Sequence, residues 1–102
     1  MFKAIILLTR REDLSQAEFR QWWLEEHAAL ARQLPGCRRL VFNVVDAPGP
    51  DDPDGISELW FDSREAFDAA YATELGRRVA ADTLAHVRAR VRLVVDERPQ
   101  VG

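Results

Sequence analysis

The chain has 102 residues, a length that predicts one domain spanning residues 1–102 with a core of moderate size. Hydrophobic residues (47%) and charged residues (30%) are typical of a globular protein, and the net charge of -3 gives no electrostatic reason to bind nucleic acid or an anionic membrane. The single cysteine, Cys37, excludes an internal disulfide and suits a reducing, cytoplasmic compartment.

Residues 3–9 form the first predicted strand. The apolar run within it, residues 4–8, is far shorter than the ~20 residues that span a bilayer, so we expect no membrane segment or signal peptide here. A sheet that carries helices on one side needs only one apolar face, yet both faces of this strand are apolar. One face holds Ile5 and Leu7, and the other holds Ala4, Ile6 and Leu8.

Residues 15–36 are predicted to form the longest helix, which ends at Pro35-Gly36. Ser15 and Glu18 make a capping box, in which each side chain satisfies a backbone N–H of the first turn. His27 lies on the apolar face of this helix. The face is marked by side chains at helical spacing, namely Phe19, Trp23, Leu30 and Leu34.

Two further strands are predicted over residues 37–45 and 56–61. Between them, residues 46–55 hold three prolines, two glycines and four aspartates, which predicts a mobile surface loop. The acidic spacing does not match an EF-hand, so no calcium site is expected. In the later strand, alternation places Ile56, Glu58 and Trp60 on one face and Ser57, Leu59 and Phe61 on the other.

The rest of the chain is predicted to form two helical stretches, capped by Ser63 and Thr73, and a final strand over residues 88–97. The order of elements is therefore β-α-β-β-α-β. With right-handed crossovers this order predicts an α+β fold, in which a four-stranded antiparallel sheet carries the helices on one face as a ferredoxin-like plait. In the final strand, Val91, Leu93 and Val95 alternate with Arg90 and Arg92.

The second apolar face of the first strand is left uncovered in a single chain of this fold. A second copy of the same sheet is the simplest cover, because one patch then satisfies both partners by twofold symmetry. The sequence therefore predicts a homodimer through the open sheet face.

Four polar residues fall where the pattern predicts apolar neighbours: His27, Glu58, Asp82 and His86. A neutral imidazole moves protons near pH 7, and a neighbouring carboxylate fixes its tautomer and stabilises its charged form. We therefore expect a cleft between helices and sheet where His27 faces an acid, either Asp82 or Glu58. The alternative is structural: His27 is a hydrogen-bonded core residue, Glu58 pairs with an arginine, and Asp82 pairs with Arg78.

Aromatic side chains are available as walls of such a cleft, which would suit a flat, apolar or aromatic small molecule. Their alternative role is in the core. The sequence holds no nucleophile motif, glycine-rich phosphate loop or clear metal-ligand cluster, so no cofactor and no metal are expected. The predicted substrate-binding residues are Trp22, Trp23, Trp60, Phe61, Tyr71, Asn43 and His86.

Nearly the whole chain, about residues 3–97, resembles the EthD family. Residues 19–30 and 34–36 are similar to its F-x-x-x-W…E-H-A-x-L…L-P-G run, and residues 54–61 are similar to its D-G-x-x-E-L-W-F segment. Ala81-Asp82 matches an Ala-Asp pair in its last helix. The resemblance implies a dimeric α+β barrel with a small-molecule role, in which His27, Glu58 and Asp82 are the functional histidine, strand acid and helix aspartate. His86 departs from the aromatic residue expected there.

The first functional hypothesis is a cofactor-independent acid–base enzyme, an isomerase, dehydratase or decarboxylase, acting on a small cyclic or aromatic metabolite of a catabolic or polyketide-type pathway. His27 moves the proton, Asp82 or Glu58 orients it, and Trp23 and Trp60 hold the ring. A second hypothesis is a non-catalytic binding protein or an accessory to an oxygenase system. A third is a cofactor-free monooxygenase.

Overall fold

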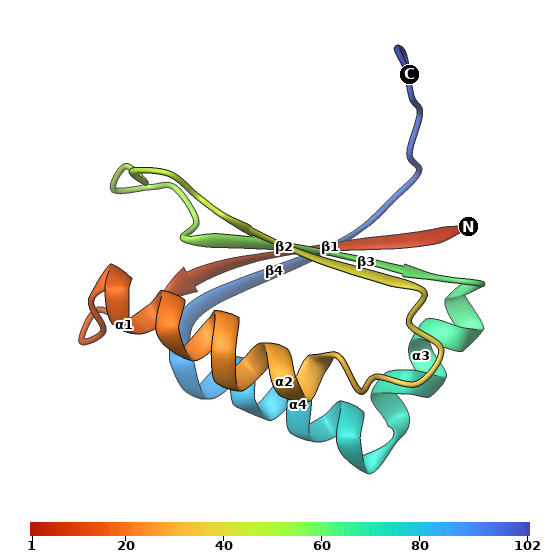
Figure 1. Ribbon diagram of the computed structural model, residues 1–102, viewed down its shortest axis with the longest axis horizontal. Helices are drawn as coiled ribbons and strands as arrows, with labels where there is room; N and C mark the ends of the chain where they lie inside the picture. The colour runs from red at the N-terminus through yellow and green to blue at the C-terminus, as the bar shows by residue number, and fades with distance from the viewer.

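The computed structural model describes residues 1–102, in which one sheet carries every helix on the same side (Figure 1). All strand pairs are antiparallel, and the strands lie in the order β2-β3-β1-β4. This is the ferredoxin-like α+β plait that the sequence predicts. The elements are β1 (Phe2–Arg10), α1 (Gln16–Gln21), η1 (Trp22–His27), α2 (Ala28–Ala31), β2 (Arg39–Val44), β3 (Gly55–Phe61), α3 (Arg64–Ala72), α4 (Glu74–His86) and β4 (Val87–Val95).

Local signals set where the helices begin. The Ser15 hydroxyl accepts from the backbone N–H of Glu18, and the Glu18 carboxylate accepts from the backbone N–H of Ser15, so the predicted capping box is confirmed. At the starts of α3 and α4, the hydroxyls of Ser63 and Thr73 accept from the backbone N–H groups of Ala66 and Gly76, without the reciprocal bond of a capping box. No helix combines the length and the apolar content needed to cross a bilayer.

The helical segment 16–31 is not regular. α1 and α2 are α-helical, but η1 between them is a π-helical turn, and the backbone N–H of Ala28 reaches the carbonyl of Trp23 five residues earlier. The apolar spacing of the sequence predicts a regular α-helix here, and that prediction is wrong over Trp22–His27.

The core fills the space between the helices and the inner face of the sheet. The register pairs Ala4, Ile6 and Leu8 of β1 with inner residues of β3, and these three side chains are buried. The largest fully buried side chains are Trp23, Phe19, Phe61, Phe67, Leu8 and Leu59. Aromatic rings from both layers meet there, since Phe61 of β3 packs edge-on against Phe67 of α3 at 5.3 Å between centroids.

The outer face of the sheet carries no helix. Ile5 lies between Glu58 and Leu93 across the strands, and Leu7 lies between Ile56 and Val91. Side chains that lie opposite one another in antiparallel strands point to the same face. The outer face is therefore largely apolar, and its apolar members are Ile5, Leu7, Val41, Ile56, Trp60, Val91, Leu93 and Val95.

The end of the predicted surface loop is anchored. Asp54 is only 8% exposed. Its carboxylate accepts from the backbone N–H of Arg10 at 2.9 Å, and its own N–H donates to the Leu8 carbonyl at 2.8 Å. Gly55 already belongs to β3. The predicted surface loop is therefore wrong at its end: Asp54 lies outside the strands but is buried, and Gly55 belongs to β3, because β1 supplies hydrogen-bond partners that composition does not show.

Gly76 allows α4 to begin directly against α3. An added Cβ there would lie 2.1 Å from the Ala70 carbonyl oxygen and 2.5 Å from the Cα of Tyr71. We expect Gly76→Ala to lower the free energy of unfolding by about 1–3 kcal/mol, since backbone atoms must shift. Gly49→Ala is the matched control, because its Cβ meets only the side chain of Asp52. Urea unfolding compares the two, and equal losses would contradict the packing argument.

Candidate active site

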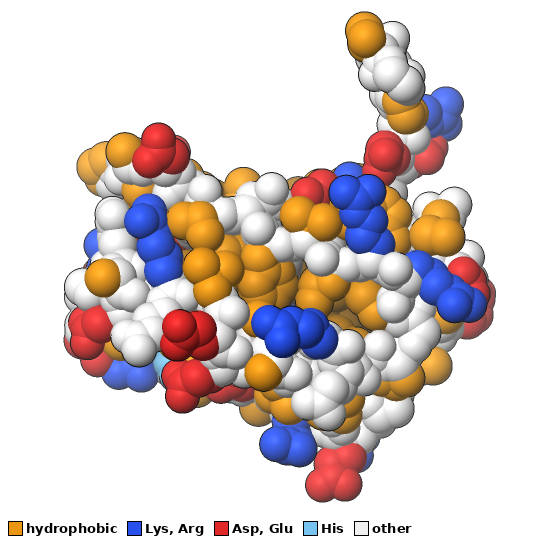
Figure 2. Space-filling view, viewed as in Figure 1, with side chains coloured by type: hydrophobic (Ala, Val, Ile, Leu, Met, Phe, Trp, Pro, Cys, Tyr) orange, Lys and Arg blue, Asp and Glu red, His pale blue; other side chains and the backbone are white.

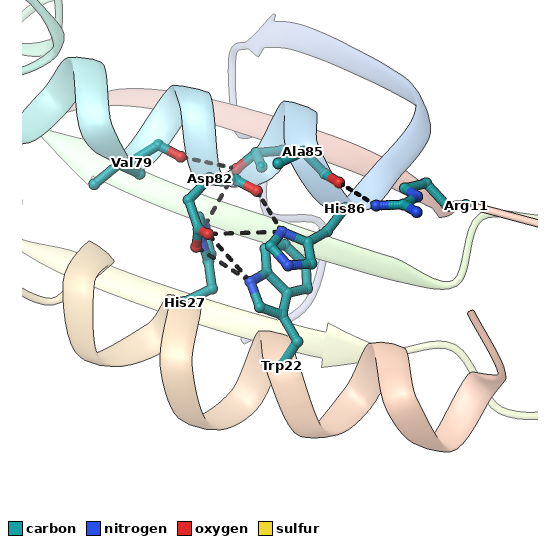
Figure 3. Close-up of polar contacts among 8 residues, drawn as sticks. Arg11, Trp22, His27, Val79, Asp82, Ala85 and His86 are labelled. Carbon is teal, nitrogen blue, oxygen red and sulfur yellow. Dashed lines mark hydrogen bonds and ion pairs between the residues drawn. The ribbon is translucent and has the colours of Figure 1, made fainter. Parts of the chain in front are cut away.

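The carboxylate of Asp82 on α4 is the centre of the candidate site (Figure 3). The Nδ1 atom of His27 lies 2.8 Å from Asp82 Oδ2, and Trp22 Nε1 donates to both carboxylate oxygens at 3.2 and 3.3 Å. The structure thus pairs His27 with Asp82 rather than with Glu58. The rings of Trp22 and His27, both from the segment 16–31, therefore contact the single carboxylate of Asp82 on α4.

The π-helical turn explains why Trp22 and His27 both reach Asp82. Residues five apart in a regular α-helix point about 140° away from each other around the axis. In a π-helix the backbone bond spans five residues, which brings positions 22 and 27 above one another. Their rings are 5.0 Å apart, and both side chains are buried. Such turns occur often at functional sites.

The hydrogen bonds define which nitrogen of His27 holds the proton. An ionised carboxylate only accepts, so Nδ1 carries the hydrogen that lies between the ring and Asp82. In the neutral ring, Nε2 then keeps its lone pair, 3.3 Å from the hydroxyl of Thr83. Burial lowers the pKa of His27, and the bond to Asp82 opposes that effect without overcoming it. The resting ring is therefore a neutral base whose acceptor nitrogen is Nε2.

His27 lines a narrow cavity between the helices and the sheet. The cavity measures about 30 Å³, the space of roughly one water molecule. Most of its wall is apolar, with Trp23 and Phe42 among the lining residues. Its polar members are His27, Ser57, Tyr71, Thr83, Arg90 and Arg92.

Tyr71 and Trp23 are the predicted binding residues that line this cavity. Burial raises the pKa of Tyr71 to about 12, so its hydroxyl stays protonated. Trp23 is fully buried and stacks on Phe42 at 4.4 Å between centroids. Phe61 is also fully buried, but it belongs to the core and does not line the cavity.

His86 supports the pair from outside the cavity. Its ring stacks on Trp22 at 4.1 Å, and its Nδ1 lies 2.8 Å from the backbone oxygen of Asp82 and 3.6 Å from Oδ1. Arg11 holds the same end of α4. Its side chain donates to the Ala85 carbonyl at 2.9 Å, and its backbone N–H donates to the His86 carbonyl. His86 therefore packs behind Trp22 and Asp82.

Glu58, Asn43 and Trp60 lie on the outer face of the sheet, away from His27. Glu58 pairs with Lys3 at 2.9 Å and accepts from the Asn43 amide at 3.0 Å, while Lys3 lies 4.5 Å from the ring centre of Trp60. The prediction that Glu58 could face His27 is wrong. Neighbouring residues of a strand point to opposite faces, so Glu58 and Trp60 point away from the side where Ser57 and Phe61 lie.

Four polar residues of the cavity were not among the predicted site residues, namely Ser57, Thr83, Arg90 and Arg92. Ser57 and Thr83 are buried. Ser57 shares the inner face with Leu59 and Phe61, and that polar residue in an apolar row was the available signal. No group of three or more His, Cys, Asp or Glu side chains lies close enough to share a metal ion.

Comparison with known proteins points to one family and one fold. A family model described as EthD domain matches residues 11–86. An EthD family protein from Bacillus halodurans is 23% identical, with a TM-score of 0.79 over 96% of this chain and 100% of that chain. No curated protein sequence matches the chain.

Two further solved structures share the fold. A dimeric ferredoxin-like protein of unknown function from Thermobifida fusca is 14% identical, with a TM-score of 0.77 over 92% of this chain and 88% of that one. SnoaB, a cofactor-independent oxygenase from Streptomyces nogalater, is 17% identical, with a TM-score of 0.74 over 98% of this chain and 95% of that one. At these identities the likeness shows the fold.

Removing the charge of Asp82 should make His27 less basic. The carboxylate raises the pKa of His27 through its hydrogen bond and its charge, so Asp82→Asn should move that pKa further below its ordinary value. The NMR titration of the ring protons of His27 measures this shift. Asp68→Asn removes one charge from an exposed position on α3 and serves as the control. An unchanged or raised pKa in Asp82→Asn would contradict the assigned hydrogen bond.

Proposed function

Since the chain belongs to the EthD family, we propose that it is an enzyme of small-molecule metabolism in which His27 moves a proton on its substrate without a cofactor. One observation carries the proposal. His27 Nδ1 is held by Asp82 at 2.8 Å, and the ring lines a cavity. A buried base with a fixed tautomer is the arrangement that general acid–base catalysis needs.

The proposed chemistry begins with Nε2 of His27, which removes a proton from a carbon of the substrate. The imidazolium that forms is stabilised by Asp82 through the Nδ1 hydrogen bond. The proton then returns to another carbon in an isomerisation or to a leaving hydroxyl in a dehydration. In a decarboxylation, a protonated His27 instead donates to the carbanion left by carbon dioxide. The apolar wall favours the role of His27 as a base, because burial keeps the resting ring neutral.

The cavity must widen to admit a substrate, because ligand pockets usually measure about 300–1,000 Å³. An apolar groove of about 340 Å³ lies directly outside it, between α2 and β2. Leu40 and Phe42 line both the groove and the cavity. Figure 2 shows hydrophobic side chains gathered in a hollow between the sheet and the helices on this side. We therefore place the substrate entrance beside Phe42.

An oxygenase reaction is the second candidate. SnoaB is a cofactor-independent oxygenase with the same fold. In such a reaction the same base would take a proton from the substrate and leave a carbanion. One electron would pass from the carbanion to dioxygen, the resulting substrate radical and superoxide would combine through a new carbon–oxygen bond, and the peroxide formed would take the proton back from His27 as a hydroperoxide. Oxygen consumption separates this candidate from the first, and ligand-induced thermal stabilisation without turnover would indicate the binding or accessory role.

We also propose that the protein forms a homodimer through the outer face of the sheet. That face is largely apolar, and Val91 and Leu93 are 49% and 47% exposed in one chain. A large exposed apolar face on a sheet is typical of an interface between copies. The relative from Thermobifida fusca is described as dimeric.

The proton-transfer role can be tested without the natural substrate, using nitrobenzisoxazole. A base takes the proton from its ring carbon, the nitrogen–oxygen bond breaks, and a coloured phenolate forms. We expect the wild-type protein to accelerate this reaction and His27→Asn to lose about 10²-fold in rate, as for a general base. The rate should rise through a pKa below the ordinary value of about 6.5 and stay flat above it, because the neutral ring is the base.

The asparagine amide can still donate to Asp82, so His27→Asn removes the base while it keeps the hydrogen bond that joins the helices. Circular dichroism and sedimentation should show an unchanged fold and assembly. Unchanged turnover in His27→Asn would rule out the mechanism.

The dimer is tested by a pair of substitutions on neighbouring residues of β4. Leu93→Arg places a charge on the outer face, and we expect the dimer to dissociate in sedimentation experiments at micromolar concentration. Val94→Arg is the matched control, since Val94 is 48% exposed but faces the helix side. A wild-type protein that sediments as a monomer, or equal effects of the two variants, would exclude this interface.

A further inference from the structure

The inner face of β4 carries arginines where the other three strands carry mostly apolar side chains. Arg90 lies opposite Leu8 and Arg92 lies opposite Ile6, and both of those partners are buried under the helices. Arg90 and Arg92 therefore point to the helix side of the sheet. Both line the cavity of His27, and the Arg92 guanidinium lies 5.1 Å from the ring centre of Phe67.

The cavity contains positive charge and no acid. Neither Arg90 nor Arg92 takes part in an ion pair, and no Asp or Glu lines the cavity. The other polar groups of the wall are the neutral His27 and three hydroxyl groups, which belong to Ser57, Tyr71 and Thr83. The lining is thus rich in donors, and its only formal charges are the two guanidinium groups.

A simpler role for these arginines is protection of the sheet edge. β4 is an edge strand, and charged side chains that point inward on an edge strand hinder pairing with other chains. Both side chains are exposed along part of their length, so their stems can cover apolar surface while the charges reach water. That role requires a charge on the strand, but it requires no particular ligand.

We propose that Arg90 and Arg92 bind an anionic oxygen of the substrate, so that the substrate is a carboxylate or a carbonyl compound that becomes an enolate. This rests on the proposed function. When Nε2 of His27 takes the proton next to a carbonyl, the electron pair of the broken C–H bond forms a C=C bond and the carbonyl oxygen becomes negative. Fixed positive charge near that oxygen stabilises the transition state, and a guanidinium fits a carboxylate with two parallel hydrogen bonds.

Benzoate and benzamide test the proposal, because they share a ring and differ in charge. The protein has only two histidines, so the ring-proton resonances of His27 report binding at the cavity by NMR, and His27→Asn assigns them. At constant ionic strength we expect benzoate to bind about tenfold more tightly than benzamide, as one charged hydrogen bond predicts. Arg90→Gln and Arg92→Gln should each weaken benzoate binding about tenfold and leave benzamide binding unchanged.

Arg98→Gln is the control, since it removes the same charge from the exposed C-terminal tail. The proposal is overturned if benzoate does not move the His27 resonances, if it binds no better than benzamide, or if Arg98→Gln weakens it equally. Aggregation of the cavity variants with an unchanged affinity ratio would assign the arginines to edge protection instead.

The outcome is separable from that of the proposed function. Arginine-dependent benzoate binding together with full proton-transfer activity in His27→Asn would leave this inference standing and remove the base. If His27→Asn loses activity but benzoate binding does not depend on the arginines, His27 remains the base and the proposed role of Arg90 and Arg92 is excluded.

Discussion

The carboxylate of Asp82 joins the two halves of the helical layer and sets the chemistry of the buried ring at the same time. Its partners, His27 and Trp22, come from a segment more than fifty positions earlier in the chain. A buried ring nitrogen without a partner destabilises a fold by a few kcal/mol. The contact that removes this penalty also fixes the His27 tautomer. Stability and the proposed proton transfer therefore depend on one set of hydrogen bonds, so we expect a substitution at Asp82 to affect both.

Local signals in the sequence were enough to predict the elements and the order in which they pack. Ser15 with Glu18, Ser63 and Thr73 mark helix starts through side chains and backbone groups that are neighbours in sequence. Asp82 could be recognised because it is an acid beside the uncharged inward positions Gly76, Val79 and Thr83 of α4. The π-helical turn could not be predicted, because it gives Trp22 and His27 a common side only through a backbone pattern that residue spacing does not encode.

The error over Glu58 has a different cause. Alternation correctly grouped Glu58 with Trp60 and separated both from Phe61, but it does not say which group faces the helices. In β1 both faces are apolar, so hydrophobicity does not decide the side. Which face of β3 points toward the helices is decided only by its register with β1 and β2. Register depends on pairing between distant segments.

The same register distributes charge between the two faces of the sheet. It places Glu58 outside, where Lys3 and Asn43 satisfy it within an otherwise apolar surface. It places Arg90 and Arg92 inside, on the cavity wall. Had β4 paired one residue out of step with β1, Val91 and Leu93 would have faced the helices and the arginines would have faced the outer surface. Such a slip would remove the guanidinium groups from the cavity wall and add them to the outer face of the sheet. The pairing of β1 with β4 therefore determines both which surface is available to a second copy and which kind of ligand suits the space beside His27.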